Sequence, residues 1–299
     1  MNEDYKNFKK NGYVIFKSGL EASEIAKLRN QILCGIKDGE SCEFGIDYAL
    51  LNNEIYETLF LKKIIEKLKK LSNKVFYLAD LNIQINKFNF SGKNKGWHID
   101  SNFEHYLKAD YLFSEDYRFY KVGIFLQDNT FEYGGGIDIK KGSHKSFKNF
   151  GRTTINHLYR QCINNIPQKK YRVPIKSGDV VIFDSRLLHA SSSSKINPDN
   201  IKKENMKIVL YWDVSGRLED AENYLNSIII KTFINKRIDK NIFNFNFLGC
   251  SYPNSFNDFQ KKLANNNGVS FASLDAEEAN HFAKKYSKLI DTENSFLKL

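Results

Sequence analysis

The chain has 299 residues, of which 41% are hydrophobic and 27% charged. Such a chain can bury a core without cross-links, and its four cysteines form no C-x-x-C pair, which argues against a disulfide framework and a zinc knuckle. The first residues lack the apolar core of a signal peptide, and no apolar run approaches the ~20 residues of a membrane span. We therefore expect a cytoplasmic protein with no membrane span.

The formal net charge is +10, which by itself fits nucleic acid, an acidic membrane surface or an anionic substrate. No motif that combines aromatic and basic residues for nucleic acid stands out, so we predict no nucleic-acid partner. The charge favours an anionic small-molecule substrate. The densest basic group is interpreted as the solvated face of an amphipathic helix and comprises Lys62, Lys63, Lys67, Lys69 and Lys70.

Two amphipathic helices are predicted in the first quarter of the chain. Apolar residues follow helical spacing at two places, and we expect both helices to pack on a sheet. The two apolar series are Ile25, Leu28, Ile32 and Ile36, and then Leu61, Ile64, Leu68 and Leu71.

From about Leu81 the sequence changes to short segments rich in Val, Ile, Phe and Tyr. With no helical pattern between successive segments, they favour an antiparallel sandwich or barrel over a parallel sheet. Residues 153–163 are read as a helix or a long insertion. The predicted strands are NIQINKFNF, YKVGIFLQD, GGIDIK, DVVIFD and KIVLYWDV.

The tail returns to a helical pattern. Asp275 and Glu278 resemble a capping box, and the apolar face that follows is Ala279, Phe282, Ala283, Tyr286 and Leu289. Because no internal repeat and no interdomain linker is evident, we expect a single domain over residues 1–299. Its core would span about residues 10–215, and residues 216–299 would form a C-terminal extension that serves as a lid, an oligomer surface or added core.

The sharpest motif is Trp97-His98-Ile99-Asp100, which follows a strand-like run. Alternate residues of a strand project from one face, so the His98 imidazole and the Asp100 carboxylate can reach one metal ion. A third candidate, His189, ends the apolar strand of SGDVVIFDSRLLHAS. Two histidines and one carboxylate leave three positions of an octahedral ion open, which suits Fe(II) and oxygen chemistry.

The other histidines are interpreted as structural or solvated. His105 is close to the H-x-D motif, and His157 and His281 lie in segments that read as helical or exposed. His144 stands in a GSH turn and is the one to test as a competing ligand. Gly134, Gly135 and Gly136 have no G-K-[ST] after them and predict a tight turn instead of a phosphate loop.

The order of these segments resembles the phytanoyl-CoA dioxygenase family of Fe(II)- and 2-oxoglutarate-dependent oxygenases. The resemblance covers about residues 10–215, in the order that the family shows, and leaves the last 80 or so residues unassigned. The matching segments are NGYVIFKSGLEASEIAKLRNQI, WHID, LQDNTFEYGGGIDIKKGSHK, GDVVIFDSRLLHAS and KIVLYWDV.

The resemblance implies a mainly β fold with flanking helices, whose core is a double-stranded β-helix, or jelly roll. It implies that His98, Asp100 and His189 bind Fe(II) and that 2-oxoglutarate and O₂ are cosubstrates. The family places an arginine at the start of the strand after the second histidine, where it pairs with the distal carboxylate of 2-oxoglutarate. This chain has Lys207 there, which supplies a point charge in place of a bidentate fork.

Other residues are candidates for the cosubstrate pocket. Arg186 and Arg217 are alternatives to Lys207, and Ser191 is placed by the resemblance to donate to the cosubstrate. Lys87, Gln127 and Trp97 are expected to line the mouth of the cavity. Asp184 is considered as a partner that orients a metal-binding histidine.

The activity implied is hydroxylation of an aliphatic C–H bond of a small molecule, with release of succinate and CO₂. Related halogenases lack the carboxylate ligand, whereas this chain keeps Asp100. Two alternatives stay open. One is a jelly-roll protein that binds metal or ligand without catalysis, which the lysine at position 207 would fit. The other is a zinc hydrolase, against which counts the lack of an evident carboxylate as general base.

Overall fold

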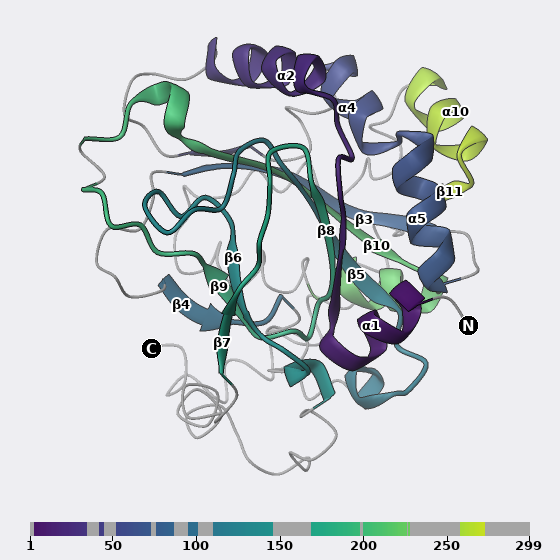
Figure 1. Ribbon diagram of the computed structural model, residues 1–299. Coiled ribbons are helices and arrows are strands. Elements are labelled where there is room, and N and C mark those ends of the chain that lie inside the picture. Colours follow the sequence, from purple (N-terminus) through teal and green to yellow (C-terminus); the bar gives the residue numbers. More distant parts are fainter. Residues whose placement is uncertain are drawn as a thin grey trace, which may run out of the picture.

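Two β-sheets face each other, and helices cover the outer side of the larger sheet (Figure 1). The computed structural model describes residues 3–34, 42–44, 52–72, 76–86, 95–100, 110–145, 169–197, 200–225, 227 and 258–272. Its α-helices are α1 (Glu3–Asn11), α2 (Ala22–Cys34), α4 (Asn53–Leu59), α5 (Lys62–Ser72) and α10 (Asp258–Asn266). Short 3₁₀ turns span Asp110–Phe113 and Lys203–Asn205.

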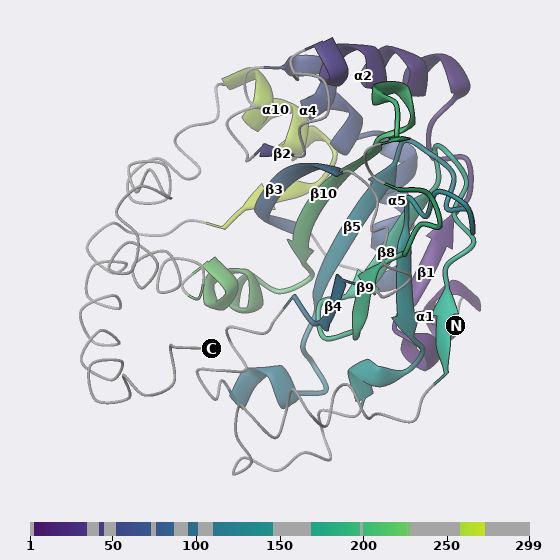
Figure 2. The same ribbon diagram turned by 90° about the vertical axis from the view of Figure 1, so that its left-hand side faces the viewer.

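The larger sheet has seven strands in the order β1-β8-β5-β10-β3-β11, with β2 also paired to β3. All pairs are antiparallel except β11 with β3. Figure 2 shows β3, β10 and β5 running side by side. The strands are β1 (Tyr13–Phe16), β2 (Cys42–Phe44), β3 (Phe76–Asn86), β5 (Phe119–Phe125), β8 (Val180–Asp184), β10 (Lys207–Ser215) and β11 (Val269–Phe271).

The smaller sheet has four antiparallel strands in the order β4-β9-β6-β7. They are β4 (Lys95–His98), β6 (Ile137–Lys140), β7 (Lys170–Arg172) and β9 (His189–Ser191). The chain passes between the sheets several times, as in a jelly roll. The predicted antiparallel fold with flanking helices is therefore confirmed, and the sheets face each other without closing into a barrel.

Strand alternation divides the core into two layers, as β10 illustrates. Ile208, Leu210 and Trp212 pack with the helices, whereas Val209 and Tyr211 pack between the sheets. Every residue of β10 is buried, so its sequence reads as one apolar run with Lys207 and Asp213 embedded in it. Both of these charged residues have the parity of the strand face that looks into the space between the sheets.

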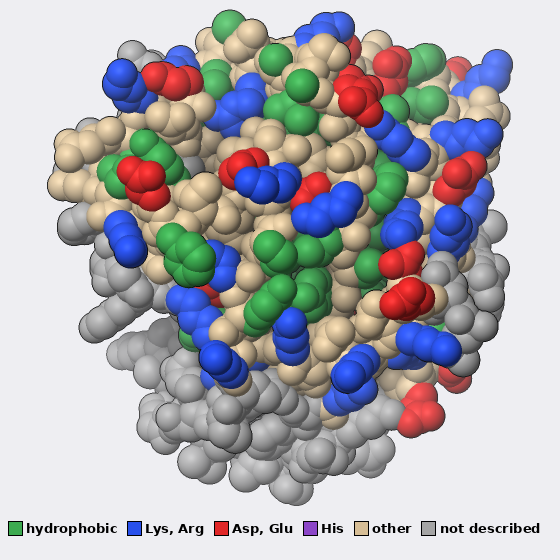
Figure 3. All heavy atoms as spheres, in the orientation of Figure 1, with side chains coloured by type: hydrophobic (Ala, Val, Ile, Leu, Met, Phe, Trp, Pro, Cys, Tyr) green, Lys and Arg blue, Asp and Glu red, His purple; other side chains and the backbone are tan. Residues whose placement is uncertain are grey.

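The two predicted N-terminal helices are confirmed as α2 and α5. They bury Ile25, Leu28 and Ile32, and Ile64, Leu68 and Leu71, respectively. Lys62 and Lys63 of α5 form ion pairs with glutamates near the surface. Lys67 departs from the predicted solvated face, because it pairs with Asp4 of α1 and only 18% of its side chain is exposed. On the face drawn in Figure 3, Lys and Arg side chains are interspersed with Asp and Glu.

Several sequence expectations fall outside the described residues. They are the insertion at 153–163, the tail helix with its capping box, and His105, His157 and His281. The division into a core and a C-terminal extension stays a prediction, although β11 of the extension pairs with β3 of the core. Gly134 and Gly135 form the predicted tight turn, with φ of 69° and 94°. Within the described part of the chain, no helix has both the length and the apolar character needed to cross a membrane.

Candidate metal centre

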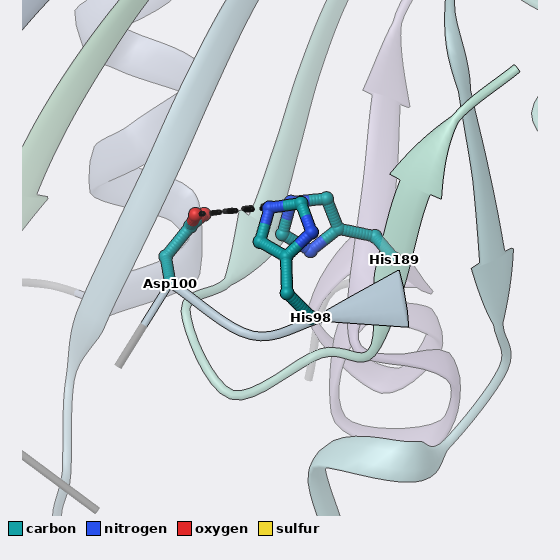
Figure 4. Close-up of side chains that lie close together, drawn as sticks. All are labelled: His98, Asp100 and His189. Carbon is teal, nitrogen blue, oxygen red and sulfur yellow. Dashed lines mark ion pairs between the residues drawn. The ribbon is translucent and has the colours of Figure 1, made fainter. Parts of the chain in front are cut away.

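His98 and His189 lie opposite each other on neighbouring antiparallel strands of the smaller sheet. They are Cα partners in the β4–β9 register, and their ring centroids are 4.4 Å apart (Figure 4). Directly opposed residues of an antiparallel pair project from the same face, so both imidazoles point into the space between the sheets. The register thus brings together two histidines that are about ninety residues apart in the sequence.

Asp100 completes the group from the turn that follows β4. Its backbone N–H donates to the carbonyl of Ser185 at 2.9 Å, which fixes the turn beside β8. Its Oδ1 is 3.9 Å from Nε2 of His98, and its Oδ2 is 3.7 Å from Nε2 of His189. One ligand atom of each residue lies within 4.8 Å of the others, as the predicted metal ligands require.

His189 is held in the form that binds a metal. Its Nδ1 lies 2.9 Å from the carbonyl of Leu187, so Nδ1 carries the proton and Nε2 is left with its lone pair toward Asp100. Burial lowers the pKa of His189 to about 4, helped by the nearby His98 and Lys121 and opposed by Asp100. The imidazole is therefore neutral at physiological pH.

The donor set fits a divalent transition metal that needs open coordination positions. Two imidazoles and one carboxylate are the protein ligands of the facial arrangement that non-haem iron uses. The side chains of His189 and Asp100 are 8% and 14% exposed, whereas that of His98 is 50% exposed. Reagents can therefore approach from the side of His98.

The sequence profile of the family described as Phytanoyl-CoA dioxygenase (PhyH) matches residues 8–195. The chain belongs to the phytanoyl-CoA dioxygenase family. It is thus an iron- and 2-oxoglutarate-dependent oxygenase, and His98, Asp100 and His189 form the group that could hold the metal. No curated protein sequence matches the chain.

Solved structures of iron- and 2-oxoglutarate-dependent enzymes share the fold of this chain. EctD from S. alaskensis with bound Fe has a TM-score of 0.54 and 16% identity, and the match covers 74% of this chain and 78% of EctD. The non-haem α-ketoglutarate-dependent carbocyclase SnoK from nogalamycin biosynthesis has a TM-score of 0.52 and 14% identity, with 72% and 83% covered. At these identities the likeness concerns the fold alone.

Lys207 begins β10 and is almost fully buried, at 3% exposure. Its Nζ donates to the carbonyl of Gly136 at 3.3 Å, next to Ile137, which lies opposite Ser191 in the β6–β9 register. Burial lowers the pKa of Lys207 to about 8, and the charge of Asp138 opposes the shift. This phytanoyl-CoA dioxygenase family member thus has a buried ammonium close to the strand that bears His189 and Ser191.

Gln127, which follows β5 in the chain, has a structural role because its side chain binds the backbone at the start of β10. Its Nε2 donates to the carbonyl of Gly135, and its Oε1 accepts from the N–H of Ile208, both at 2.6 Å. It therefore anchors the strand end that carries Lys207. The expectation that Gln127 lines the cavity stays a prediction, and Lys87 lies outside the described residues.

Arg186 is engaged elsewhere in this fold. Its Nε and NH2 donate to the two carboxylate oxygens of Asp184 at 2.8 and 2.7 Å, and NH1 donates to the carbonyl of Leu112. Asp184 is accordingly the partner of Arg186, and it is the Leu187 carbonyl that orients the metal-binding His189. Arg217 pairs with Glu219 near the surface, with 30% of its side chain exposed.

The structure also shows the surroundings of Trp97 and His144, and His144 is a structural residue, as predicted. Trp97 lies beside Lys140, 5.4 Å from its Nζ, on the outer side of the smaller sheet. The reason is alternation, because Ile139 and His98 face inward and their neighbours face outward. His144 packs under α1 against Gly12 and is not part of the metal-binding group.

Sequence reasoning missed Lys121 and Asp213. The ammonium of Lys121 lies 3.1 Å from Asp213 Oδ2 and 3.9 Å from Asp100 Oδ2, and both residues are less than a tenth exposed. A signal was present, since each is a lone charged residue inside an apolar strand, in YKVGIF and YWDV. Charged side chains are rarely buried unless they are paired.

Proposed function

We propose that the protein is a hydroxylase that inserts oxygen into an aliphatic C–H bond of a small-molecule substrate. The complete His98, Asp100 and His189 group carries the proposal, because the carboxylate occupies a position that halogenases leave to chloride. When bound, iron and 2-oxoglutarate supply the oxidant, as O₂ converts the cosubstrate to succinate and CO₂ and hydroxylates the substrate.

The residues of the chain then have distinct tasks. His189 offers Nε2 as a neutral ligand because its Nδ1–H donates a hydrogen bond to the Leu187 carbonyl. His98 offers its imidazole from the exposed side, where a substrate can approach. Asp100 contributes the negative charge that partly neutralises a divalent ion.

We further propose that Lys207 and Ser191 bind the distal carboxylate of 2-oxoglutarate. Three observations support Lys207: it is buried, it stands at the start of β10, and its Nζ reaches the segment that pairs with Ser191. The carboxylate would supply the counter-charge for a buried ammonium, which is costly without one. The two-point pairing of Arg186 with Asp184 favours Lys207 over Arg186.

The test is an anaerobic titration of the purified protein with Fe(II) and 2-oxoglutarate, which monitors the weak visible charge-transfer band that chelation produces. We expect the band in the wild type and in Asp116→Ala, whose side chain is 79% exposed. It should be absent in Asp100→Ala and His189→Ala. Iron binding without the band would instead favour a binding protein that has lost the cosubstrate pocket.

Hydroxylation is tested separately by a substrate screen. Succinate formation that rises with a compound, together with a product that has gained one oxygen atom from O₂, supports the proposal. Desaturated or cyclised products would show an oxygenase of this family with a different outcome. Tight zinc binding with hydrolysis and no use of 2-oxoglutarate would overturn it.

A further inference from the structure

Lys121 and Asp213 form a buried ion pair that faces the metal centre. They are Cα partners in the β5–β10 register, on strand faces that look into the space between the sheets. Nζ of Lys121 lies 3.1 Å from Oδ2 of Asp213, and the hydroxyl of Tyr224 donates to the same oxygen at 3.3 Å. Lys121 also lies over the ring of Tyr211, with Nζ 5.4 Å from the centroid. Its ammonium is therefore held from several sides.

The same ammonium is the link between the larger sheet and the metal-binding carboxylate. Nζ of Lys121 is 3.9 Å from Oδ2 of Asp100, the oxygen that lies 3.7 Å from Nε2 of His189. Asp100 reaches this point from the turn after β4, where its backbone is anchored to Ser185. The Asp100 carboxylate thus lies between the imidazoles of the smaller sheet and Lys121 of the larger one.

We propose that Lys121 is a positioning residue, which orients the Asp100 carboxylate for metal binding and is itself held by Asp213 and Tyr224. A carboxylate rotates readily about its bond to Cβ, and a site that must keep three positions open needs it in one orientation. The inference rests on the metal centre of the proposed function. It does not depend on the substrate or on Lys207.

A contribution to stability does not by itself explain why Lys121 and Asp213 form a buried ion pair here. Replacing a buried ion pair by apolar residues of similar volume is often neutral or stabilising, because desolvation offsets the attraction between the charges. Removing only Lys121 would leave Asp213 as an uncompensated buried charge and would confuse folding with metal binding. The informative variant removes both charges and so preserves the net charge beside the metal.

The experiment compares Lys121→Met/Asp213→Asn with the wild type in metal-free protein titrated with Co(II). The ligand-field absorption of Co(II) reports the ligand geometry and needs neither 2-oxoglutarate nor turnover. We expect the double variant to bind Co(II) about 10- to 100-fold more weakly, the usual cost of losing a residue that orients a ligand, and to show a changed spectrum. Asp213→Asn and Lys121→Arg, which keep a cation near Asp100, should retain the wild-type spectrum.

A purely structural role predicts a different result. If Lys121 only neutralises Asp213, the folded double variant will bind Co(II) with the affinity and spectrum of the wild type, and the proposal is overturned. Thermal unfolding and circular dichroism establish that each variant is folded. Should the methionine variant fail to fold, Lys121→Gln/Asp213→Asn keeps polar groups at both positions and gives the same two outcomes. If the wild type shows no 2-oxoglutarate turnover while the double variant still has the expected weaker Co(II) binding and changed spectrum, the result counts against the proposed function alone.

Discussion

Arg186 and Asp184 form a buried two-point ion pair across the turn that follows β8. The guanidinium donates to both carboxylate oxygens at 2.8 and 2.7 Å and stacks near the ring of Tyr117, 4.6 Å from its centroid. The N–H of Asp184 donates to the carbonyl of Gly12, so the pair also ties this turn to the N-terminal segment. Arg186 therefore has a structural role, which is to hold the turn after β8 in place.

Arg186→Met should therefore destabilise the protein, because it leaves the Asp184 carboxylate buried without its partner. We expect a loss of about 3–5 kcal/mol in the free energy of unfolding, measured with urea. The double variant Asp184→Asn/Arg186→Met should recover most of that loss. At a temperature where both variants are folded, their affinity for 2-oxoglutarate should match the wild type; a tenfold weaker affinity in both would place Arg186 in the cosubstrate pocket instead.

Lys207 should make the binding of 2-oxoglutarate depend on pH in the alkaline range. The pKa of this buried lysine is about 8 in the free protein, so above pH 8 its neutral amine must take up a proton before it can pair with a carboxylate. The apparent affinity should then fall by up to about tenfold for each further pH unit. The measurement is a titration of the iron-loaded protein with 2-oxoglutarate under anaerobic conditions from pH 7 to 9.5.

Two substitutions of Lys207 separate charge from shape. Lys207→Arg should bind 2-oxoglutarate with little pH dependence, because an arginine stays charged over this range. Lys207→Met should bind about 10- to 100-fold more weakly at pH 7, as expected for a lost charge-assisted hydrogen bond. Wild-type affinity in the methionine variant would show that another cation binds the distal carboxylate.

Metal-free protein should lose stability in acid because of His189. Its pKa is lowered from 6.5 to about 4 in the folded protein, mainly by burial. Below pH 6.5 the imidazole of His189 binds a proton in the unfolded chain, whereas it stays neutral in the folded protein. The contribution of His189 to the free energy of unfolding is therefore fully present above pH 6.5 and is lost as the pH falls toward 4. Between pH 7 and 4.5 the wild type should lose on the order of 2 kcal/mol more than His189→Gln. Parallel stability curves for the two proteins would contradict this.

Gly12 is required where α1 meets the turn that bears the metal ligand. Its φ is +83°, and a Cβ would lie 2.5 Å from Nδ1 of His144 and 2.7 Å from Cδ1 of Leu187. Gly12→Ala should cost about 2–4 kcal/mol, from backbone strain together with overpacking, and should weaken metal binding by displacing the carbonyl that orients His189. Gly142→Ala is the matched control, since φ is +77° but a Cβ would meet, among the residues that the structure describes, one backbone oxygen, at 3.3 Å. It should cost about 1 kcal/mol and leave metal affinity unchanged.

The sequence by itself determined the features that repeat locally along the chain. Helical spacing predicted α2 and α5, and short segments rich in Val, Ile, Phe and Tyr between turn residues predicted the strands β5, β6, β8 and β10. The H-x-D motif and His189 were found because metal ligands are few in type and occur at recognisable places. The order of the matching segments along the chain then indicated the family.

Only the tertiary structure decided which polar residues meet between the sheets. The strand register sets His98 opposite His189 and Lys121 opposite Asp213, and these pairings join segments about ninety residues apart. Arg186 and Lys207 are both basic residues near the second metal motif, and the local sequence does not show which of them has an acidic partner. The fold separates them because Asp184 neutralises one, whereas burial beside Gly136 leaves the other with a lowered pKa. Side-chain direction and partner choice depend on packing across the two sheets, and no local pattern encodes that information.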